Sequence, residues 1–346
     1  MILTAASSIY GAAAAWRRRW YARDPARCKR LARPVISVGN LSTGGSGKTP
    51  VVAELARLLV VHGERPAILS RGYARRHAAD GVTVVSDGAR ILADVDHAGD
   101  EPLMLAEAVP AARVLVGADR YLSGTLAEQR FGVTVHVLDD GFQHLALARD
   151  VDLLLVDESD LDDDVLPSGR LRERVAAAAA AHAILIPASS AAAADRVQRA
   201  CGVATMFTVR RSLGAPVWLR DGRPTEIPAG APVFAVAGIA RPGRFFDDLA
   251  SSGWTIVGTM PFRDHHRFTE TDVRQMTNAA RAANAAAILM TEKDAVRLDP
   301  RLLDDPPAAR VPLRVVVEPP TFVDWLLDRL RDAREQAVEP GRDGRP

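Results

Sequence analysis

A glycine-rich loop between an apolar run and a helix-compatible run constrains the fold of this chain most strongly. The run Val35–Val38 precedes the loop Gly44-Gly45-Ser46-Gly47-Lys48-Thr49, and leucines with helical spacing follow between Pro50 and Val61. Glycines here let backbone N–H groups turn toward a phosphate, and the following helix presents its positive end to the same anion. We therefore predict a strand, a phosphate-binding loop and a helix, which is typical of α/β proteins that bind a nucleoside triphosphate.

The side chains of this loop suit ATP and Mg²⁺. Lys48 can reach the β- and γ-phosphates, the Thr49 hydroxyl can ligate Mg²⁺, and Pro50 is tolerated in a first helical turn. Ser42 stands where the stricter pattern has glycine, and Thr43 stands where partitioning ATPases carry an extra lysine. Eight consecutive residues are predicted to contact the nucleotide: Thr43, Gly44, Gly45, Ser46, Gly47, Lys48, Thr49 and Pro50.

A second apolar run ends in acidic residues. Thr134–Leu138 is followed by Asp139-Asp140-Gly141-Phe142-Gln143-His144. A strand that ends in aspartate is typical of the Walker B element, whose carboxylate holds Mg²⁺ directly or through water. Asp139 and Asp140 suit one metal-side role and one hydrogen-bonding role, and the pattern leaves open which of them contacts the metal first.

Apolar runs alternate with helix-compatible stretches from residue 34 onward, which predicts an α/β fold. We expect a P-loop-type, mostly parallel sheet with helices on both faces, joined by a β-ribbon to a smaller α/β domain. The predicted parts are an N-terminal region 1–33, a P-loop domain 34–205, a two-stranded linker 206–232, a C-terminal domain 233–337 and a disordered tail 338–346.

The N-terminal region carries an apolar stripe and a basic flank. Ile2, Ile9, Trp16 and Trp20 share one helical face, and several arginines follow them. Aromatic anchors with cationic neighbours favour a helix lying on a membrane surface, whereas a helix packed on its own domain is the alternative. No run of 18 apolar residues exists, so no transmembrane helix is expected.

Charge and cysteine content exclude several classes of protein. The 44 Lys and Arg residues nearly balance the 43 Asp and Glu residues, which argues against a partner that is nucleic acid. The two cysteines, Cys28 and Cys201, form no CxxC pair, so neither a zinc site nor a disulfide framework is predicted. Only three lysines occur in this arginine-rich chain, and two of them, Lys48 and Lys293, stand in candidate motifs.

Two further segments offer groups for acid–base chemistry. Asp100, in Gly99-Asp100-Glu101-Pro102, suits either the base that accepts a proton from an attacking hydroxyl or a helix N-cap. His265, in Asp264-His265-His266, suits either a partner for a carboxylate across a domain cleft or a surface histidine. Adjacent histidines point in different directions, so a two-histidine metal site is not expected.

Arginine or lysine also stands beside glycine or a predicted strand end in three places. These are Arg71 and Tyr73 in Ser70–Tyr73, Arg172 in Gly169–Glu173, and Lys293 in Thr291–Asp294. Each suits contact with an anionic group of the substrate. In a chain with 41 arginines coincidence is a serious alternative for the arginine motifs, and a solvated loop is the alternative for Lys293.

Taken together, these motifs resemble one family, the tetraacyldisaccharide 4′-kinases. Similar motifs occur in the same order over roughly residues 1–330: GNLSTGGSGKTP, SRGY, GDEP, DDGFQH, GRLRE, DHH and TEKDAVRL. The resemblance implies an ATP- and Mg²⁺-dependent kinase that phosphorylates the 4′-hydroxyl of a tetraacylated glucosamine disaccharide 1-phosphate, the lipid A precursor. It also implies a membrane-associated N-terminal helix at the cytoplasmic face of the inner membrane of a Gram-negative bacterium.

The resemblance also implies roles for single residues. Lys48 and Thr49 correspond to phosphate and metal residues, Asp139 and Asp140 to the Walker B pair, and Asp100 to the base with His265 as its partner. Glu173 and Gln143 correspond to supporting groups near the metal and the nucleotide. No obligate protein partner is expected. Two alternatives stay open: a P-loop ATPase that switches a protein partner, and a kinase of a small soluble acceptor.

Overall fold

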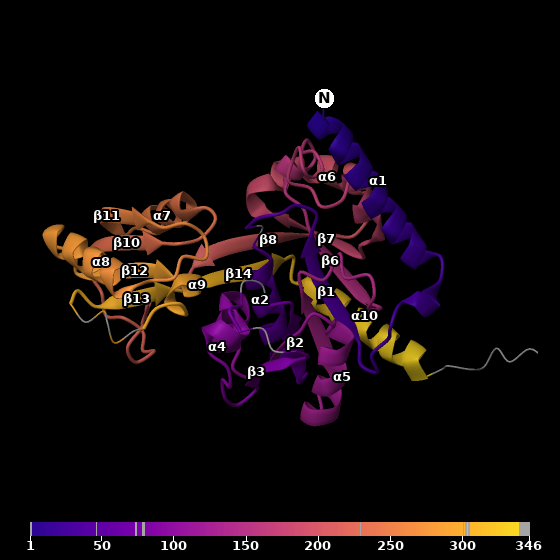
Figure 1. Cartoon of the computed structure of the whole chain (residues 1–346), viewed down its shortest axis with the longest axis horizontal. Helices are drawn as coiled ribbons and strands as arrows, with labels where there is room; N and C mark the ends of the chain where they lie inside the picture. The colour runs from indigo at the N-terminus through magenta and orange to yellow at the C-terminus, as the bar shows by residue number, and fades with distance from the viewer. Residues whose placement is uncertain are drawn as a thin grey trace, which may run out of the picture.

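Two α/β units of unequal size make up the molecule (Figure 1). The computed structural model describes residues 2–45, 47–72, 75–77, 80–228, 230–299, 301, 303 and 305–338. Two predicted site residues, Ser46 and Tyr73, and the predicted tail beyond Val338 lie outside the described residues.

The larger unit is built on a nine-stranded sheet with the order β14-β8-β7-β6-β1-β5-β2-β4-β3. Its inner strands pair in parallel, and β14 and β3 pair antiparallel at the two edges. The strands are β1 Val35–Asn40, β2 Pro66–Ser70, β3 Thr83–Asp87, β4 Arg113–Val116, β5 Val135–Asp139, β6 Val151–Leu155, β7 Ala183–Pro187, β8 Met206–Leu213 and β14 Leu313–Glu318.

Helices cover both faces of this sheet, as predicted for the fold class. Ile36 and Val38 of β1 belong to the core beneath α2, α4 and α10, whereas Val35 belongs to the core beneath α5. Successive strand residues point to opposite faces, so a strand that is apolar throughout contributes side chains to two cores. The helices of this unit are α1 Ile2–Ala22, α2 Lys48–Val61, α3 Val95–Ala98, α4 Asp100–Ala108, α5 Arg120–Phe131, α6 Ala194–Cys201 and α10 Thr321–Val338, with 3-10 turns at Pro25–Arg27, Glu158–Asp160, Val175–Ala180 and Ala188–Ala193.

The smaller unit has a five-stranded sheet with the order β11-β10-β12-β13-β9. Phe234 and Val236 pack toward α8, and the alternating residues Val233 and Ala235 pack toward α7. Its elements are β9 Val217–Trp218, β10 Pro232–Ala237, β11 Thr255–Pro261, β12 Ala287–Thr291, β13 Ala308–Val311, α7 Pro242–Ser251, α8 Glu270–Ala282 and α9 Glu292–Ala295.

The connection between the units differs from the predicted two-stranded linker within 206–232. β8 pairs with β14, which comes from far along the chain, and Figure 1 shows both strands running toward the smaller unit. After β14 the chain returns, and α10 packs Phe322, Leu326 and Leu330 into the core of the large sheet. The predicted C-terminal domain 233–337 therefore extends too far, because the residues after β13 belong to the larger unit. Its last helix has an apolar face that only the large sheet can cover, because α7 and α8 already cover the small one.

α1 lies along the outside of the larger unit (Figure 1). Among helices of the described residues, none combines the length and the hydropathy needed to cross a bilayer. Ser7 of α1 donates a hydrogen bond to Ser168 (2.8 Å), while the Ile9 and Trp16 side chains on α1 stay 72% and 64% exposed. One face of this helix thus contacts the protein and another carries exposed apolar groups.

Candidate active site

The phosphate loop lies between β1 and α2, as the sequence predicts. Gly44 and Gly47 have φ angles of 101° and 81°, and no atom of the described residues lies within 4 Å of where a Cβ would stand on either. Such positive φ values favour glycine and leave the loop backbone open toward a ligand. α2 begins at Lys48, so its first N–H groups and the positive end of its dipole face the loop.

Lys48 belongs to a polar cluster at the carboxyl end of β1. Its Nζ donates to Oδ1 of Asn40 (2.8 Å) and lies 3.5 Å from Oδ1 of Asp140. Arg172 donates to the same Asn40 oxygen (2.6 Å) and to both oxygens of Asp140 (2.8 and 2.9 Å). The cluster therefore places two cations beside the loop, with one carboxylate and one amide oxygen orienting them.

The Gly169–Glu173 segment supports the loop through its backbone. The Thr43 N–H donates to the carbonyl of Arg170 (2.8 Å), and the Arg172 N–H donates to the carbonyl of Leu41 (2.6 Å). These bonds join two segments that lie far apart in the sequence. Arg172, predicted at the substrate, accordingly lies on the nucleotide side of the site.

Asp139 ends β5 beside β1, in register with Val38. Burial, reinforced by the negative charges of Glu101 and Asp140, raises the pKa of its carboxyl to about 7. Its Oδ1 is buried without a hydrogen-bond partner among the described residues. A buried, unpartnered carboxylate oxygen next to a phosphate loop fits a divalent cation, which would restore the charge balance.

The other two predicted metal carboxylates have cationic partners. Burial alone would raise the pKa of Asp140, but the bonds and charges of Arg172 and Lys48 hold it below its usual range. Glu173 accepts two hydrogen bonds from Arg18 of α1 (2.6 and 2.7 Å). Within the described residues no group of three His, Cys, Asp or Glu could hold a metal. Mg²⁺ commonly needs only one or two protein carboxylates beside phosphate and water, so Asp139 suffices.

The segment after Asp140 crosses over β1. A Cβ on Gly39 would overlap Phe142, so only glycine permits this close approach. The Gln143 side chain donates to the Asn40 carbonyl (3.0 Å), while its Oε1 is buried without a described partner. Gln143 thus lies beside the loop, where the resemblance places it.

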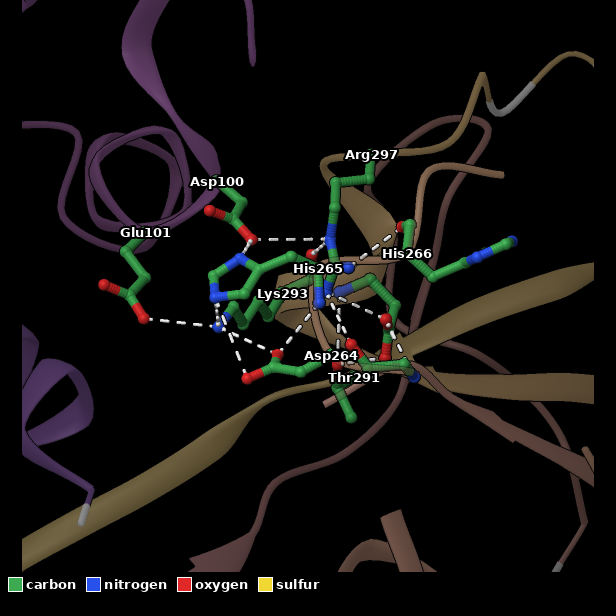
Figure 2. A network of polar contacts seen from close by, with 10 residues as sticks. Asp100, Glu101, Asp264, His265, His266, Thr291, Lys293 and Arg297 are labelled. Atoms are coloured by element: carbon green, nitrogen blue, oxygen red, sulfur yellow. Dashed lines mark hydrogen bonds and ion pairs between the residues drawn. The ribbon is translucent and has the colours of Figure 1, made fainter. Parts of the chain in front are cut away.

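A second polar network joins the two units (Figure 2). Nδ1 of His265 lies 2.8 Å from Oδ2 of Asp100, and the Asp100 side chain is 6% exposed. Asp100 lies in the first turn of α4, and His265 has a φ of 58° on the loop after β11. His266 turns away, stacks on Phe262 and contacts Asp272 (3.1 Å), so the two adjacent histidines point in different directions, as predicted.

Lys293 lies in this network rather than in a solvated loop. Its Nζ donates to Glu101 and to Asp264 (3.3 Å each) and lies 3.5 Å from Nε2 of His265. Burial alone would lower the pKa of the Lys293 ammonium, but the charges of Glu101, Asp100 and Asp264 raise it. The lysine is therefore charged and links the carboxylates around His265.

Arg297 contacts Asp100 and the backbone next to His265. Its Nε lies 3.6 Å from Oδ2 of Asp100, and its Nη1 donates to the carbonyl of His266 (3.0 Å). Asp294, fully buried, accepts from Arg297 and from the Gly238 N–H (3.0 Å each). A cavity of about 320 Å³ opens beside this network, lined among others by Arg76, Asp100, His265, Arg267 and Arg297.

The two networks lie within electrostatic reach of each other. The charge of Glu101, next to Asp100, is among the causes that raise the Asp139 pKa. Folding thus brings together the predicted residues of the phosphate loop, the acidic strand end and Asp100. Arg71 is exposed, and its positive charge is among the causes that lower the pKa of Arg120.

Sequence reasoning missed three polar residues of the site. Asn40 is fully buried and orients Lys48. Arg120 is buried, and its positive charge acts to lower the pKa of Asp139. Arg18 contacts Glu173. Asn40 and Arg120 follow predicted strands, and a polar residue at a strand end was a usable signal. Arg18 stands in a run of arginines, where nothing local separates it from its neighbours.

Comparison with known proteins identifies the family. A family model described as tetraacyldisaccharide-1-P 4′-kinase matches residues 1–331. Curated proteins named tetraacyldisaccharide 4′-kinase include one from Desulfotalea psychrophila, 39% identical over 303 residues (85% of this chain, 86% of the relative), and one from Anaeromyxobacter dehalogenans, 40% identical over 346 residues (97% and 89%). A crystal structure of the "apo" form of LpxK from Aquifex aeolicus in complex with ATP superposes with a TM-score of 0.76 at 30% identity, covering 94% of this chain and 96% of that one. The motif resemblance and the fold are thereby confirmed, and the chain belongs to the tetraacyldisaccharide-1-P 4′-kinase family.

Proposed function

We propose that this kinase transfers the γ-phosphoryl group of ATP to the 4′-hydroxyl of a tetraacyldisaccharide 1-phosphate, giving lipid IVA. The observation that supports the proposal is the Asp100–His265 contact, which holds a carboxylate suited to act as a base beside a cavity. A nucleotide switch needs no such pair, and two exposed tryptophans on α1, Trp16 and Trp20, argue against a small soluble acceptor.

The nucleotide side neutralises and orients the triphosphate. The N–H groups of the loop and of the first turn of α2 donate to phosphate oxygens, and Lys48 stabilises charge on the transferring group. Arg172 lies beside Lys48 and adds a second cation. Gln143 contributes its unpartnered buried oxygen near the nucleotide.

Thr49 and Asp139 are the residues that would hold Mg²⁺. Asp140 pairs with Arg172 and Glu173 pairs with Arg18, so we assign both carboxylates a supporting role. The ion would neutralise the negative charge of the triphosphate. The buried, unpartnered Oδ1 of Asp139 supports this assignment.

On the acceptor side, an Asp100 carboxylate oxygen accepts the proton of the 4′-hydroxyl. The hydroxyl oxygen forms its bond to the γ-phosphorus while the bond to the ADP oxygen breaks, so ADP leaves. His265 holds the Asp100 carboxylate in place through its Nδ1, and Lys293 stabilises the neighbouring carboxylate of Glu101. Both are positioning residues here, since Asp100 alone touches the reacting hydroxyl.

A lipid acceptor requires the enzyme to work at a bilayer surface. Ile9, Trp16 and Trp20 of α1 would enter the interface, and neighbouring arginines would contact anionic lipid headgroups. We propose that the protein acts peripherally at the cytoplasmic face of the inner membrane of a Gram-negative bacterium.

The test combines purified protein, Mg·ATP and tetraacyldisaccharide 1-phosphate in mixed micelles. We expect a 4′-phosphorylated product together with stoichiometric ADP. ATP turnover that is indifferent to the glycolipid would contradict the proposal and favour a nucleotide switch. Deletion of residues 1–33 should reduce sedimentation with anionic vesicles, and unchanged sedimentation would contradict the membrane role.

A further inference from the structure

α1 presents two opposite faces to two different environments. In a helix each residue turns about 100°, so Ser7, Gly11 and Arg18 fall within about 40° of one another. Ser7 bonds to Ser168, a Cβ on Gly11 would lie 3.1 Å from Arg174, and Arg18 reaches Glu173, so this face contacts the protein. By the same rotation the exposed side chains of Ile9, Trp16 and Trp20 lie about 180° away.

Arg18 makes the most extensive contact between α1 and the site. Its guanidinium donates two hydrogen bonds to Glu173 (2.6 and 2.7 Å) and one to the carbonyl of Phe142 (3.2 Å). The same group lies over the Phe142 ring at 4.2 Å. Both side chains of the ion pair are mostly buried, with 14% of Arg18 and 7% of Glu173 exposed.

These contacts reach the segment that carries the Walker B aspartates. Phe142 follows Asp139 and Asp140 by only a few residues and crosses β1 at Gly39. The neighbouring Arg17 also donates to this segment, at the carbonyl of Gln143 (3.0 Å). One turn of α1 therefore holds the acidic segment and Glu173 together.

From this we propose that Arg18 is a positioning residue that ties the seating of α1 on a lipid surface to the geometry of Glu173 and of segment 139–144. The inference rests on the proposed function and adds the device by which the lipid surface reaches the nucleotide side. A bidentate, planar contact transmits orientation as well as charge, which a single-point cation does not.

Loss of the guanidinium leaves two buried acceptors without donors. Glu173 and the Phe142 carbonyl would have to move or recruit water, because burying unpaired polar groups is costly. α1 would still present its exposed apolar face to a bilayer, since that face lies opposite. A variant that lacks Arg18 should therefore still bind vesicles but have an altered site geometry.

The test compares R18M and R18K with R19M in the full-length protein. R19M is the matched control, because Arg19 is exposed and its side chain makes no hydrogen bond or ion pair to residues that the structure describes. We measure sedimentation with vesicles of phosphatidylethanolamine and phosphatidylglycerol, kcat and KM in mixed micelles, and amide hydrogen exchange across 139–144 with and without vesicles.

We expect R18M to sediment like R19M, to lower kcat by about tenfold relative to R19M, and to keep KM for ATP within about threefold. Vesicles should slow exchange across 139–144 in the wild type and in R19M but not in R18M. Equal kcat and equal exchange in R18M and R19M would overturn the proposal.

R18K keeps the inference testable if R18M does not fold. It retains the charge but not the forked donor geometry, so we expect kcat between those of the wild type and R18M, and a weakened exchange response. R18K that matches the wild type in both measurements would overturn the proposal. A wild type that phosphorylates no acceptor would instead refute the proposed function.

Discussion

The nucleotide side and the acceptor side of this site are built in different ways. Asn40 and Asp139 end the neighbouring parallel strands β1 and β5, and Lys48 begins the helix that follows β1, so local register places the three together. Asp100 and His265 come from two different units and meet at 2.8 Å through side chains alone. The first side is a property of one sheet, whereas the second depends on how the units are held.

Ion pairs concentrate along that second boundary. Besides Asp100–His265, residues 96–107 contact the smaller unit through Asp96–Arg267, Glu101–Lys293, Asp100–Arg297 and Glu107–Arg310. Asn40, Lys48 and Asp139 all belong to the larger unit, although Arg241 and Arg244 of the smaller unit line a pocket with the phosphate loop. The Asp100–His265 pair, in contrast, exists only through contact between the units. Closure of two units around substrates is a common way to exclude water from phosphoryl transfer.

The largest effect is expected on the nucleotide side. Lys48→Ala should lower kcat/KM by about a thousandfold, because it removes the cation that stabilises the transferring phosphoryl group. The control is Lys29→Ala, since Lys29 is exposed and its ammonium contacts only Asp119 and the Tyr121 ring among the described residues. Steady-state kinetics with mixed micelles measure both, and similar activities of the two variants would refute the role of Lys48.

On the acceptor side, Asp100→Asn should lower kcat by about a hundredfold or more while ATP affinity stays nearly unchanged. The amide keeps the size of the side chain but cannot accept the hydroxyl proton. His265→Gln should have a smaller effect in the same direction, and His266→Gln is its control because His266 points toward Asp272. Isothermal titration with an ATP analogue separates binding from kcat, and an unchanged kcat in Asp100→Asn would exclude it as the base.

Lys293→Met removes a cation at the boundary between the units and leaves the phosphate loop unchanged. We expect kcat to fall by about tenfold with little change in ATP affinity, because Glu101 and Asp264 lose their shared cation. Arg281→Met provides the control, since Arg281 pairs with Asp305 at an exposed position of the same unit. A loss of ATP affinity as large as the loss of kcat would show that the boundary between the units also determines nucleotide binding.

The smallest effect concerns pH and stability on the nucleotide side. Burial and the charges of Arg120 and Arg149 lower the pKa of His144 to about 4. An unfolded chain takes up this proton below about pH 6.5 and the folded protein does not, so the free energy of unfolding falls as pH drops from 6.5 toward 4. His144→Gln should reduce this loss by about 1 kcal/mol at about pH 5, after allowance for partial exposure of the ring.

Urea unfolding at about pH 7.5 and about pH 5 measures this difference. The exposed His97, replaced by Gln, is the control. An equal acid-side loss of stability in His144→Gln and in the wild type would show that this ring does not carry the effect.

Much of the nucleotide side could be predicted from the sequence, because its residues follow strands whose apolar character is local. The loop before Lys48 and the Asp139–Asp140 pair follow β1 and β5, and parallel strands carry their ends to one edge. The same logic predicted helices on both faces. It missed β13, which has only four residues, two of them alanine, and β14, most of whose side chains are only partly buried or exposed. It therefore misplaced the boundary of the smaller unit.

The chain alone thus determined the strand–loop–helix unit, the acidic strand end and the two-faced character of α1, since each depends on neighbours within a few residues. Only the tertiary structure decided that Arg172 joins Lys48, that Arg18 reaches Glu173 and that Lys293 links the carboxylates around His265. In an arginine-rich chain many cations look alike, and a partner's identity depends on which segments packing brings together. The geometry of packing, rather than local composition, separates these residues from their neighbours.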